Sequence, residues 1–251
     1  MDFLETILVQ KAKEVAQLPD VELQEMPKRP SFYEIVLNQP EKMHVIGEIK
    51  RASPSKGDIN TEVDILAQAK TYQAAGVSAI SVLTDEVFFK GKIEDLRQIA
   101  QVVDAPLLCK DFIVSKKQLI RAKNAGASLV LLIVAALEQE NLQKLYQTAT
   151  DLGLEVLVET HDQEELTRAQ AIGAKIIGVN NRNLKTFEVA IATSVALAPE
   201  KSATIYISES GFKTGADVLR VTKNYHGVLV GETLMRASDA AEKIQELRVH
   251  R

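Results

Sequence analysis

The feature that most constrains the fold is a regular alternation between short apolar segments and longer helical segments. The apolar segments are rich in Val, Ile and Leu and recur about every 20 to 35 residues, the length of one strand–helix unit. The intervening segments carry Ala, Leu, Gln, Glu and Lys at helical spacing. Eight strands are therefore expected, at His44–Lys50, Ser78–Leu83, Pro106–Lys110, Ser128–Val134, Leu154–Glu159, Lys175–Asn180, Thr204–Ser208 and Gly227–Val230.

This pattern predicts an α/β protein with the (β/α)8 TIM-barrel fold. Nearly continuous apolar strands are typical of a parallel sheet that helices cover, and eight such units make one barrel. A doubly wound open sheet is the alternative, but it usually carries a glycine-rich phosphate motif after its first strand. No G-x-G-x-x-G occurs in the chain.

Residues 1–43 precede the first expected strand and have their own helical patterns, in FLETILVQKAKEVAQL and SFYEIVLNQ. We expect an N-terminal helical extension that covers the bottom of the barrel or leans over its mouth. No linker-like stretch divides the chain, so residues 1–251 are predicted to form a single domain.

Composition excludes several classes of protein. The single cysteine, Cys109, cannot form an internal disulfide or a cysteine-based zinc site, which favours a reducing compartment. The net charge of −4 gives no general electrostatic argument for nucleic-acid binding. The first residues lack the basic region of a signal peptide, and the longest apolar run, around Leu129 to Leu137, is too short for a bilayer. We expect a cytoplasmic monomer or weak homodimer that binds neither nucleic acid nor membrane.

Polar residues gather where the expected strands end, which is where (β/α)8 barrels hold their active sites. At any one position a surface ion pair is the more common explanation, but two lysines and three glutamates on four strand ends favour a site. A partly desolvated lysine can donate a proton and a nearby glutamate can accept one. The candidates are Glu48, Lys50, Lys110, Glu159, Asn180, Arg182, Glu209 and Ser210.

The period of two along a strand decides which of these residues share a face. Cys109 and Lys110 are adjacent, so if Lys110 points into the barrel, Cys109 packs toward the helices as a small hydrophobic residue. Glu209 and Ser210 are also adjacent. Either only one of them faces the site, or the strand has already become a loop at that point.

The remaining strand-end residues indicate an anionic, partly aromatic substrate. The loops SESG and VGET, after the last two strands, have small residues that let backbone N–H groups approach a phosphate, although simple turn glycines would look the same. Arg182 can hold a carboxylate with its guanidinium fork. An apolar slot for an aromatic ring is a further hypothesis, with plain core packing as the alternative; its candidates are Pro54, Phe89, Phe112, Leu131 and Leu184.

Motifs for metal or nucleotide chemistry do not occur. The chain has no H-E-x-x-H, no Walker motif and no G-x-S-x-G, so neither a metal nor a cofactor is expected. The four histidines make no set. His161 lies two residues after Glu159 and is interpreted as a loop histidine.

With these residues identified, the chain resembles the indole-3-glycerol phosphate synthase family. The resemblance implies a (β/α)8 barrel with an N-terminal helical segment and a cofactor-free lyase of tryptophan biosynthesis. The implied reaction converts 1-(o-carboxyphenylamino)-1-deoxyribulose 5-phosphate to indole-3-glycerol phosphate, releasing CO2 and water. The matching stretches, in chain order, are GEIKRASPSKG, SVLTDEVFFKG, LLCKDFI, LLIVAAL, LVETHDQEEL, IGVNNRNLKTF, ISESGF and VGETLMR.

The resemblance also implies a role for each candidate residue. Lys110 is implied as the general acid for ring closure, Glu159 as a base or acid–base partner in the dehydration, and Lys50 as the second lysine. How the two lysines divide the acid roles stays open. Glu48, Asn180, Glu209 and Ser210 are implied as orienting residues, Arg182 as part of the charged network at the anthranilate end, Ser53, Gly211, Gly231 and Glu232 as the phosphate site, and Phe89, Phe112, Leu131 and Leu184 as the aromatic pocket.

Two alternatives remain beside this interpretation. One is another phosphate-binding barrel, such as a phosphoribosylanthranilate isomerase, which typically uses a Cys/Asp pair; a Cys109 that points away from the mouth disfavours it. The other is a barrel kept only for binding. It predicts missing charges at the strand ends, and none is missing.

Overall fold

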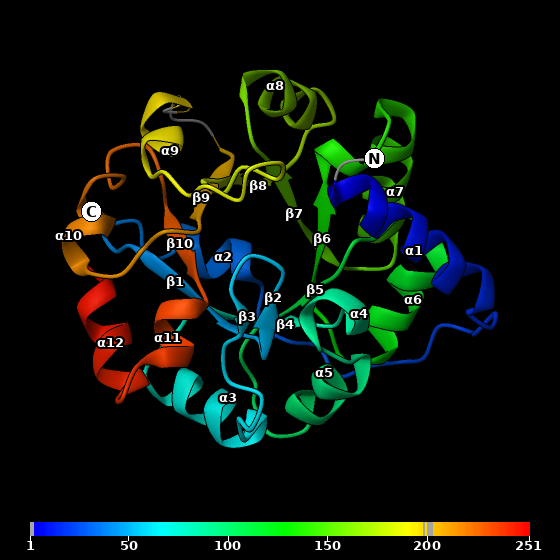
Figure 1. The fold of residues 1–251 in the computed structure, drawn as a ribbon, viewed down its shortest axis with the longest axis horizontal. Coiled ribbons are helices and arrows are strands. Elements are labelled where there is room, and N and C mark those ends of the chain that lie inside the picture. The colour runs from blue at the N-terminus through cyan, green and yellow to red at the C-terminus, as the bar shows by residue number, and fades with distance from the viewer. Residues whose placement is uncertain (1–2, 198, 200–202) are drawn as a thin grey trace.

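Eight parallel strands close into a barrel in the computed structural model, which describes residues 3–197, 199 and 203–251 (Figure 1). Around the ring the order is β1-β10-β9-β8-β7-β6-β5-β4, so strands that follow one another in the chain lie side by side. This closed ring confirms the (β/α)8 prediction and excludes the open sheet. The barrel strands are β1 (His44–Ile49), β4 (Ala79–Leu83), β5 (Leu107–Lys110), β6 (Leu129–Ile133), β7 (Glu155–Thr160), β8 (Ile176–Asn180), β9 (Ile205–Glu209) and β10 (Gly227–Val230).

Helices surround the barrel as an outer ring (Figure 1). A small hairpin of β2 (Ala52–Ser53) and β3 (Gly57–Asp58) follows β1. Over residues 3–197, 199 and 203–251, no helix has both the length and the apolarity of a membrane span. The outer helices are α3 (Ile65–Ala74), α4 (Glu86–Phe89), α5 (Ile93–Ala100), α6 (Lys116–Asn124), η1 (Val134–Ala136, 3-10), α7 (Gln139–Asp151), α8 (Gln163–Ala171), α9 (Ala192–Leu197), α10 (Gly215–Leu219), α11 (Glu232–Arg236) and α12 (Ala240–Leu247).

The core has two layers because alternate strand residues face opposite ways. One layer fills the barrel interior with residues such as Ile46, Leu108 and Leu157. The other lies between the strands and the helices, and Cys109 belongs to it. Burial raises the pKa of the Cys109 thiol to about 12, so the thiol stays neutral at neutral pH. The predicted direction of Cys109, away from Lys110, is what the structure shows.

The N-terminal extension covers both ends of the barrel. α2 (Phe32–Leu37) closes the bottom, where Phe32 packs with the interior layer. The Glu155 carboxylate, at the start of β7, accepts hydrogen bonds from Ser31 Oγ at 2.6 Å and Phe32 N at 2.8 Å. α1 (Phe3–Gln17) lies at the opposite end, and Phe3 and Ile7 line the cavity at the barrel mouth. The two possibilities that the sequence left open are therefore both realised.

Candidate active site

The strand alternation that fills the barrel interior also carries charge to its mouth. Glu48 lies two residues after the interior residue Ile46, and Lys110 lies two after Leu108. Glu159 and Glu209 follow Leu157 and Ile207 in the same way. Because residues two apart on a strand share a face, four strands direct charged side chains to one place.

Lys110 lies at the centre of these charges. Its ammonium nitrogen is 3.1 Å from Glu209 Oε2, 3.5 Å from Glu48 Oε2 and 3.7 Å from Glu159 Oε2. Burial opposes the charged form of Lys110, but the attraction of the three carboxylates outweighs it and raises the pKa of Lys110 above its ordinary value. Lys110 is therefore a charged proton donor at neutral pH.

The three glutamates do not titrate alike. Burial opposes ionisation of Glu48, but Lys50 and Lys110 lower the pKa of this carboxyl below its usual range. For Glu209, burial outweighs the attraction of Lys110, and the nearby charge of Glu159 adds to it, so that the pKa rises to about 7. The cluster can therefore hold one carboxyl close to half-protonated at neutral pH.

Two glycines make room for this cluster. A Cβ on Gly178 of β8 would collide with the Glu209 carboxylate, and a Cβ on Gly231 would collide with Glu48 and stand 2.8 Å from Lys50 Nζ. The Lys50 ammonium itself pairs with Glu48 Oε1 at 2.6 Å. Gly231, expected only in the phosphate loop, thus also borders the charged centre.

His161 is part of the site, although the sequence suggested an ordinary loop histidine. Its Nε2 lies 3.3 Å from Glu159 Oε1, and its Nδ1 lies 2.9 Å from Glu165 Oε2. Burial lowers the pKa of His161, but the two carboxylates outweigh it and raise that pKa to about 10. Burial likewise opposes ionisation of Glu159, yet His161, Lys110 and Asn180 lower its pKa to about 2. The spacing of two residues from Glu159 was the available signal.

A cavity of about 830 Å³ opens above the charged centre. Glu209 does not itself line the cavity, but its carboxylate contacts Lys110, which does. The strand β9 ends at Glu209, and Ser210, with φ +68°, belongs to the loop that follows. The structure thus brings all the residues predicted for the site to one mouth. The lining includes Glu48, Lys50, Ser53, Pro54, Phe89, Lys110, Phe112, Leu131, Glu159, Asn180, Arg182, Leu184, Ser210, Gly211, Gly231 and Glu232.

The cavity has an apolar end and a glycine-rich end. At the apolar end, the rings of Phe89 and Phe112 have centroids 6.2 Å apart. At the other end, Gly231 is the N-cap of α11, so no side chain caps the first N–H groups of this helix. The Glu232 carboxylate is 3.3 Å from Arg236 and 4.0 Å from Lys56. Those cations offset its charge, which would otherwise oppose an anion here.

Arg182 borders the cavity from the loop after β8. Its Nη1 donates to Ser55 Oγ at 2.8 Å and to the Phe187 carbonyl at 3.3 Å, and its backbone N donates to Asn180 Oδ1 at 3.0 Å. Burial lowers the pKa of the guanidinium below its ordinary value. The contact with Ser55 joins Arg182 to the hairpin after β1. In the part of the chain that the structure describes, no group of three His, Cys, Asp or Glu side chains is arranged to hold a metal ion.

Solved structures with the same architecture are distant in sequence. 3-Hexulose-6-phosphate synthase from Salmonella typhimurium aligns with a TM-score of 0.66 at 14% identity, covering 82% of this chain and 96% of that one. Thiamine phosphate pyrophosphorylase from Pyrococcus furiosus aligns with a TM-score of 0.60 at 15% identity, covering 82% and 93%. At such identities the likeness shows the barrel fold alone.

Sequence comparison is more specific. The family model for indole-3-glycerol phosphate synthase matches residues 4–247. An indole-3-glycerol phosphate synthase from Listeria welshimeri is 58% identical over 252 residues, covering 100% of both chains. One from Streptococcus sanguinis is 53% identical over 249 residues, covering 99% of this chain and 98% of that one. The chain therefore belongs to the indole-3-glycerol phosphate synthase family.

Proposed function

We propose that the chain carries out the reaction of its family through the charged cluster around Lys110. The reaction is that of a carboxy-lyase in tryptophan biosynthesis: ring closure, decarboxylation and dehydration of 1-(o-carboxyphenylamino)-1-deoxyribulose 5-phosphate. The observation that carries the proposal is the position of the Lys110 ammonium, which meets three carboxylates at the floor of a cavity with an aromatic end and a glycine-rich end.

The shape of the cavity supports one orientation of the substrate. Its carboxyphenyl ring lies against Phe89, Phe112, Leu131, Leu184 and Pro54, and Arg182 attracts the carboxylate. Its phosphate accepts hydrogen bonds at the opposite end, from Ser53 and from backbone N–H groups around Gly211, Gly231 and Glu232. The ribulose carbonyl then lies between the ends, within reach of Lys110.

Ring closure needs an acid at the ribulose carbonyl. The ring carbon that bears the carboxylate attacks C2 of the ribulose, and Lys110 transfers a proton to the carbonyl oxygen as it becomes a hydroxyl. The contacts of Lys110 with Glu48 and Glu159, at 3.5 and 3.7 Å, are long for charge-assisted hydrogen bonds. A carbonyl oxygen can therefore replace one of them without leaving the ammonium unpaired.

Decarboxylation follows with little help from charged groups. The bond between the ring carbon and the carboxylate breaks, CO2 leaves, and the electron pair returns to the ring system. An apolar surrounding favours this step because the charge of the carboxylate disappears as CO2 forms. The walls formed by Phe89 and Phe112 supply that surrounding.

Dehydration needs a base and an acid. Glu159, held ionised by His161 and Lys110, is proposed as the base or acid–base partner that removes the proton as hydroxide leaves. The leaving hydroxide takes a proton from an ammonium and departs as water. Lys50 and Lys110 both lie at this mouth. Glu48, Asn180, Glu209 and Ser210 orient these groups and the substrate.

The proposal extends to the organisation of the protein. We propose a single domain over residues 1–251, with 1–43 as its extension, that needs no cofactor, binds no nucleic acid or membrane, and works in the cytoplasm as a monomer or weak homodimer. The free, buried Cys109 thiol supports a reducing location. The negative net charge gives no reason to expect nucleic acid as a partner.

A direct assay tests this function. The synthetic substrate is added to the purified chain, and indole fluorescence is followed; the chain has no Trp to obscure it. We expect indole-3-glycerol phosphate to form with release of one CO2 for each product molecule. A folded protein that binds the substrate but forms no indole would contradict the proposal.

A further inference from the structure

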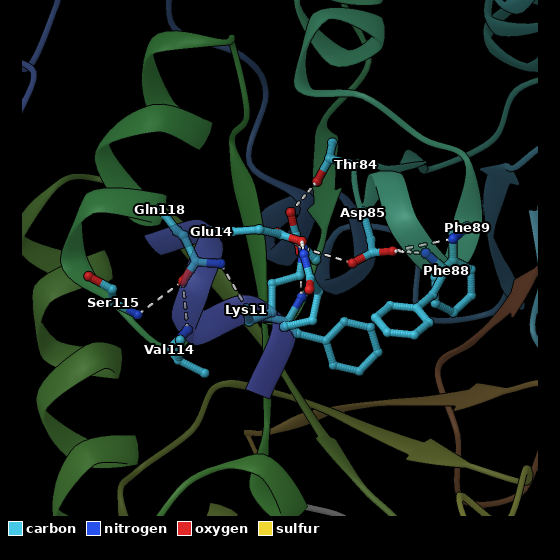
Figure 2. A network of polar contacts seen from close by, with 12 residues as sticks. Lys11, Glu14, Thr84, Asp85, Phe88, Phe89, Val114, Ser115 and Gln118 are labelled. Carbon is cyan, nitrogen blue, oxygen red and sulfur yellow. Dashed lines mark hydrogen bonds and ion pairs between the residues drawn. The ribbon is translucent and has the colours of Figure 1, made fainter. Parts of the chain in front are cut away.

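A buried lysine lies outside the charged centre described above, on the N-terminal helix. The Lys11 side chain is 1% exposed and points from α1 toward Asp85 (Figure 2). Its ammonium lies 2.7 Å from Asp85 Oδ2, 2.8 Å from Asp111 Oδ1 and 2.8 Å from Glu14 Oε2. Asp85 follows β4 and Asp111 follows β5, so one side chain joins α1 to two strand ends.

The same two aspartates also hold the backbone of the aromatic end. Asp85 Oδ1 accepts hydrogen bonds from Phe88 N at 2.7 Å and Phe89 N at 3.3 Å, as the N-cap of α4 (Figure 2). Asp111 Oδ1 accepts from Phe112 N at 2.8 Å. Lys11 therefore contacts the two aspartates that bind the backbone N–H groups of Phe89 and Phe112, whose rings line the cavity.

α1 itself forms a further wall of the cavity. Phe3, Leu4 and Ile7 line it. The Phe3 ring packs edge-on against Phe88, with centroids 5.5 Å apart, and against Phe187, with centroids 5.1 Å apart. The helix therefore lies over the end that is proposed to receive the carboxyphenyl ring.

A buried charge is an expensive way to attach a helix, because each ion loses its hydration. An apolar residue would attach α1 at least as strongly, but it would not fix where the helix lies along the barrel. A lysine that must meet two aspartates at once admits one position. Burial opposes its charge, yet the carboxylates keep the pKa of Lys11 above its ordinary value, so the contacts persist at neutral pH.

We propose that Lys11 is a positioning residue for substrate recognition: it holds α1 as a roof over the aromatic end of the cavity and aligns the backbone of Phe89 and Phe112. The inference rests on the proposed function, since it takes that end as the site of the carboxyphenyl ring. It assigns α1 to the binding of the ring and gives it no part in proton transfer.

The test separates the two ends of the substrate. In Lys11→Met, α1 loses the two contacts that fix its position over the cavity. The substrate ring then loses apolar contacts in both the ground state and the transition state. KM for the substrate should therefore rise by at least about tenfold while kcat stays within about threefold. The dissociation constant of the reduced substrate analogue should rise by the same factor. That of inorganic phosphate should stay within about twofold, because the glycine-rich end is untouched.

A second variant removes the charge imbalance that Lys11→Met creates. Asp111 keeps Arg121 at 3.4 Å and the Thr84 hydroxyl at 3.0 Å, whereas Asp85 has no second cation among the ion pairs of the described residues. Lys11→Met combined with Asp85→Asn neutralises this carboxylate, and the amide oxygen that replaces it can still cap α4. This double variant should fold stably and still show the raised KM.

Lys117→Met is the matched control. Lys117 also ties the N-terminal segment to the barrel, through the Leu18 carbonyl and Asp20 Oδ1, both at 3.0 Å, but it does not line the cavity. Its KM should be unchanged.

The outcomes are distinct. Product formation by the unaltered protein, measured first, tests the proposed function separately. If that succeeds and the double variant keeps KM within about twofold, or lowers kcat at unchanged KM, the inference is wrong. Failure of the double variant to fold would also overturn it, because Lys11 would then serve folding and not the roof.

Discussion

Two lysines, each among three carboxylates, lie near the mouth of this barrel and differ in how tightly they are held. The contacts of Lys11 with its carboxylates measure 2.7 to 2.8 Å, and its side chain is 1% exposed. The contacts of Lys110 measure 3.1 to 3.7 Å, and its side chain is 15% exposed. We call these the closed cluster and the open cluster. The closed cluster is thus packed too tightly for substrate to enter, whereas the open cluster leaves room for it.

The carboxylates explain the difference. In the closed cluster, Asp85 and Asp111 also accept hydrogen bonds from backbone N–H groups, so their positions are fixed by the chain itself. Asp85 Oδ2 in the closed cluster and Glu209 Oε1 in the open cluster are both buried without a hydrogen-bond partner in the described part of the chain. Asp85 Oδ2, however, lies 2.7 Å from the Lys11 ammonium, whereas Lys110 contacts Glu209 through Oε2. Charge-paired oxygens fix positions, whereas an oxygen with no partner leaves a group whose proton can move.

The largest effect should come from breaking the open cluster. Lys110→Met removes the acid for ring closure, so kcat/KM should fall by about 10² to 10⁴-fold, the usual contribution of general acid catalysis. Glu48 and Glu159 line the cavity, where water can take the place of the ammonium beside them, so the variant should remain folded. Indole fluorescence and urea unfolding measure the two quantities. Turnover within a few-fold of the unaltered protein would exclude this role.

Breaking the closed cluster should lower the free energy of unfolding, whereas breaking the open cluster should mainly lower activity. Lys11→Met leaves Asp85 buried and charged, and loss of one partner from a buried pair costs about 3–5 kcal/mol of unfolding free energy. Adding Asp85→Asn should recover part of that loss. Urea midpoints of Lys11→Met, the double variant and Lys110→Met, measured together, decide the comparison. An equal loss in Lys11→Met and Lys110→Met would show that the two clusters do not differ.

The open cluster should also make the stability of the protein depend on pH. The folded protein raises the pKa of Glu209 to about 7, from an ordinary value of 4.5. The folded state therefore binds this proton more tightly, and the resulting stability is complete below pH 4.5 and is lost as the pH rises through 7. Glu209→Gln should remove this loss, which is on the order of 2–3 kcal/mol. Urea unfolding at pH 5 and pH 8 measures it; a variant with the unaltered pH slope would contradict the assignment.

The open cluster could be predicted from the sequence, but the closed cluster could not. Lys110 is the last residue of a barrel strand and lies two residues after Leu108, which faces the barrel interior. The period of two along a strand therefore places Lys110 at the mouth, whatever the details of packing. Lys11 lies on a helix, where lysine usually faces water, and Asp85 and Asp111 are far along the chain. The available signal was its spacing: Lys11 comes four residues after the buried Ile7, on the apolar face. The route of α1 over the mouth depends on tertiary contacts that no local pattern encodes.

His161 offers the smallest effect and tests how the open cluster keeps Glu159 ionised. His161→Gln removes a cation beside Glu159, whose pKa of about 2 should then rise toward its ordinary value. The stability that this carboxylate contributes is present above pH 4.5 and lost as the pH falls through 2, so the loss should move to higher pH. The acidic limb of the kcat/KM profile should shift the same way, with less than about a tenfold loss at pH 8, since Lys110 still attracts Glu159. His250→Gln, at an exposed position outside the cavity, is the control and should leave the profile unchanged. An unshifted acidic limb in His161→Gln would mean that Lys110 and Asn180 alone hold the base ionised, and that the open cluster needs no support from the loop after β7.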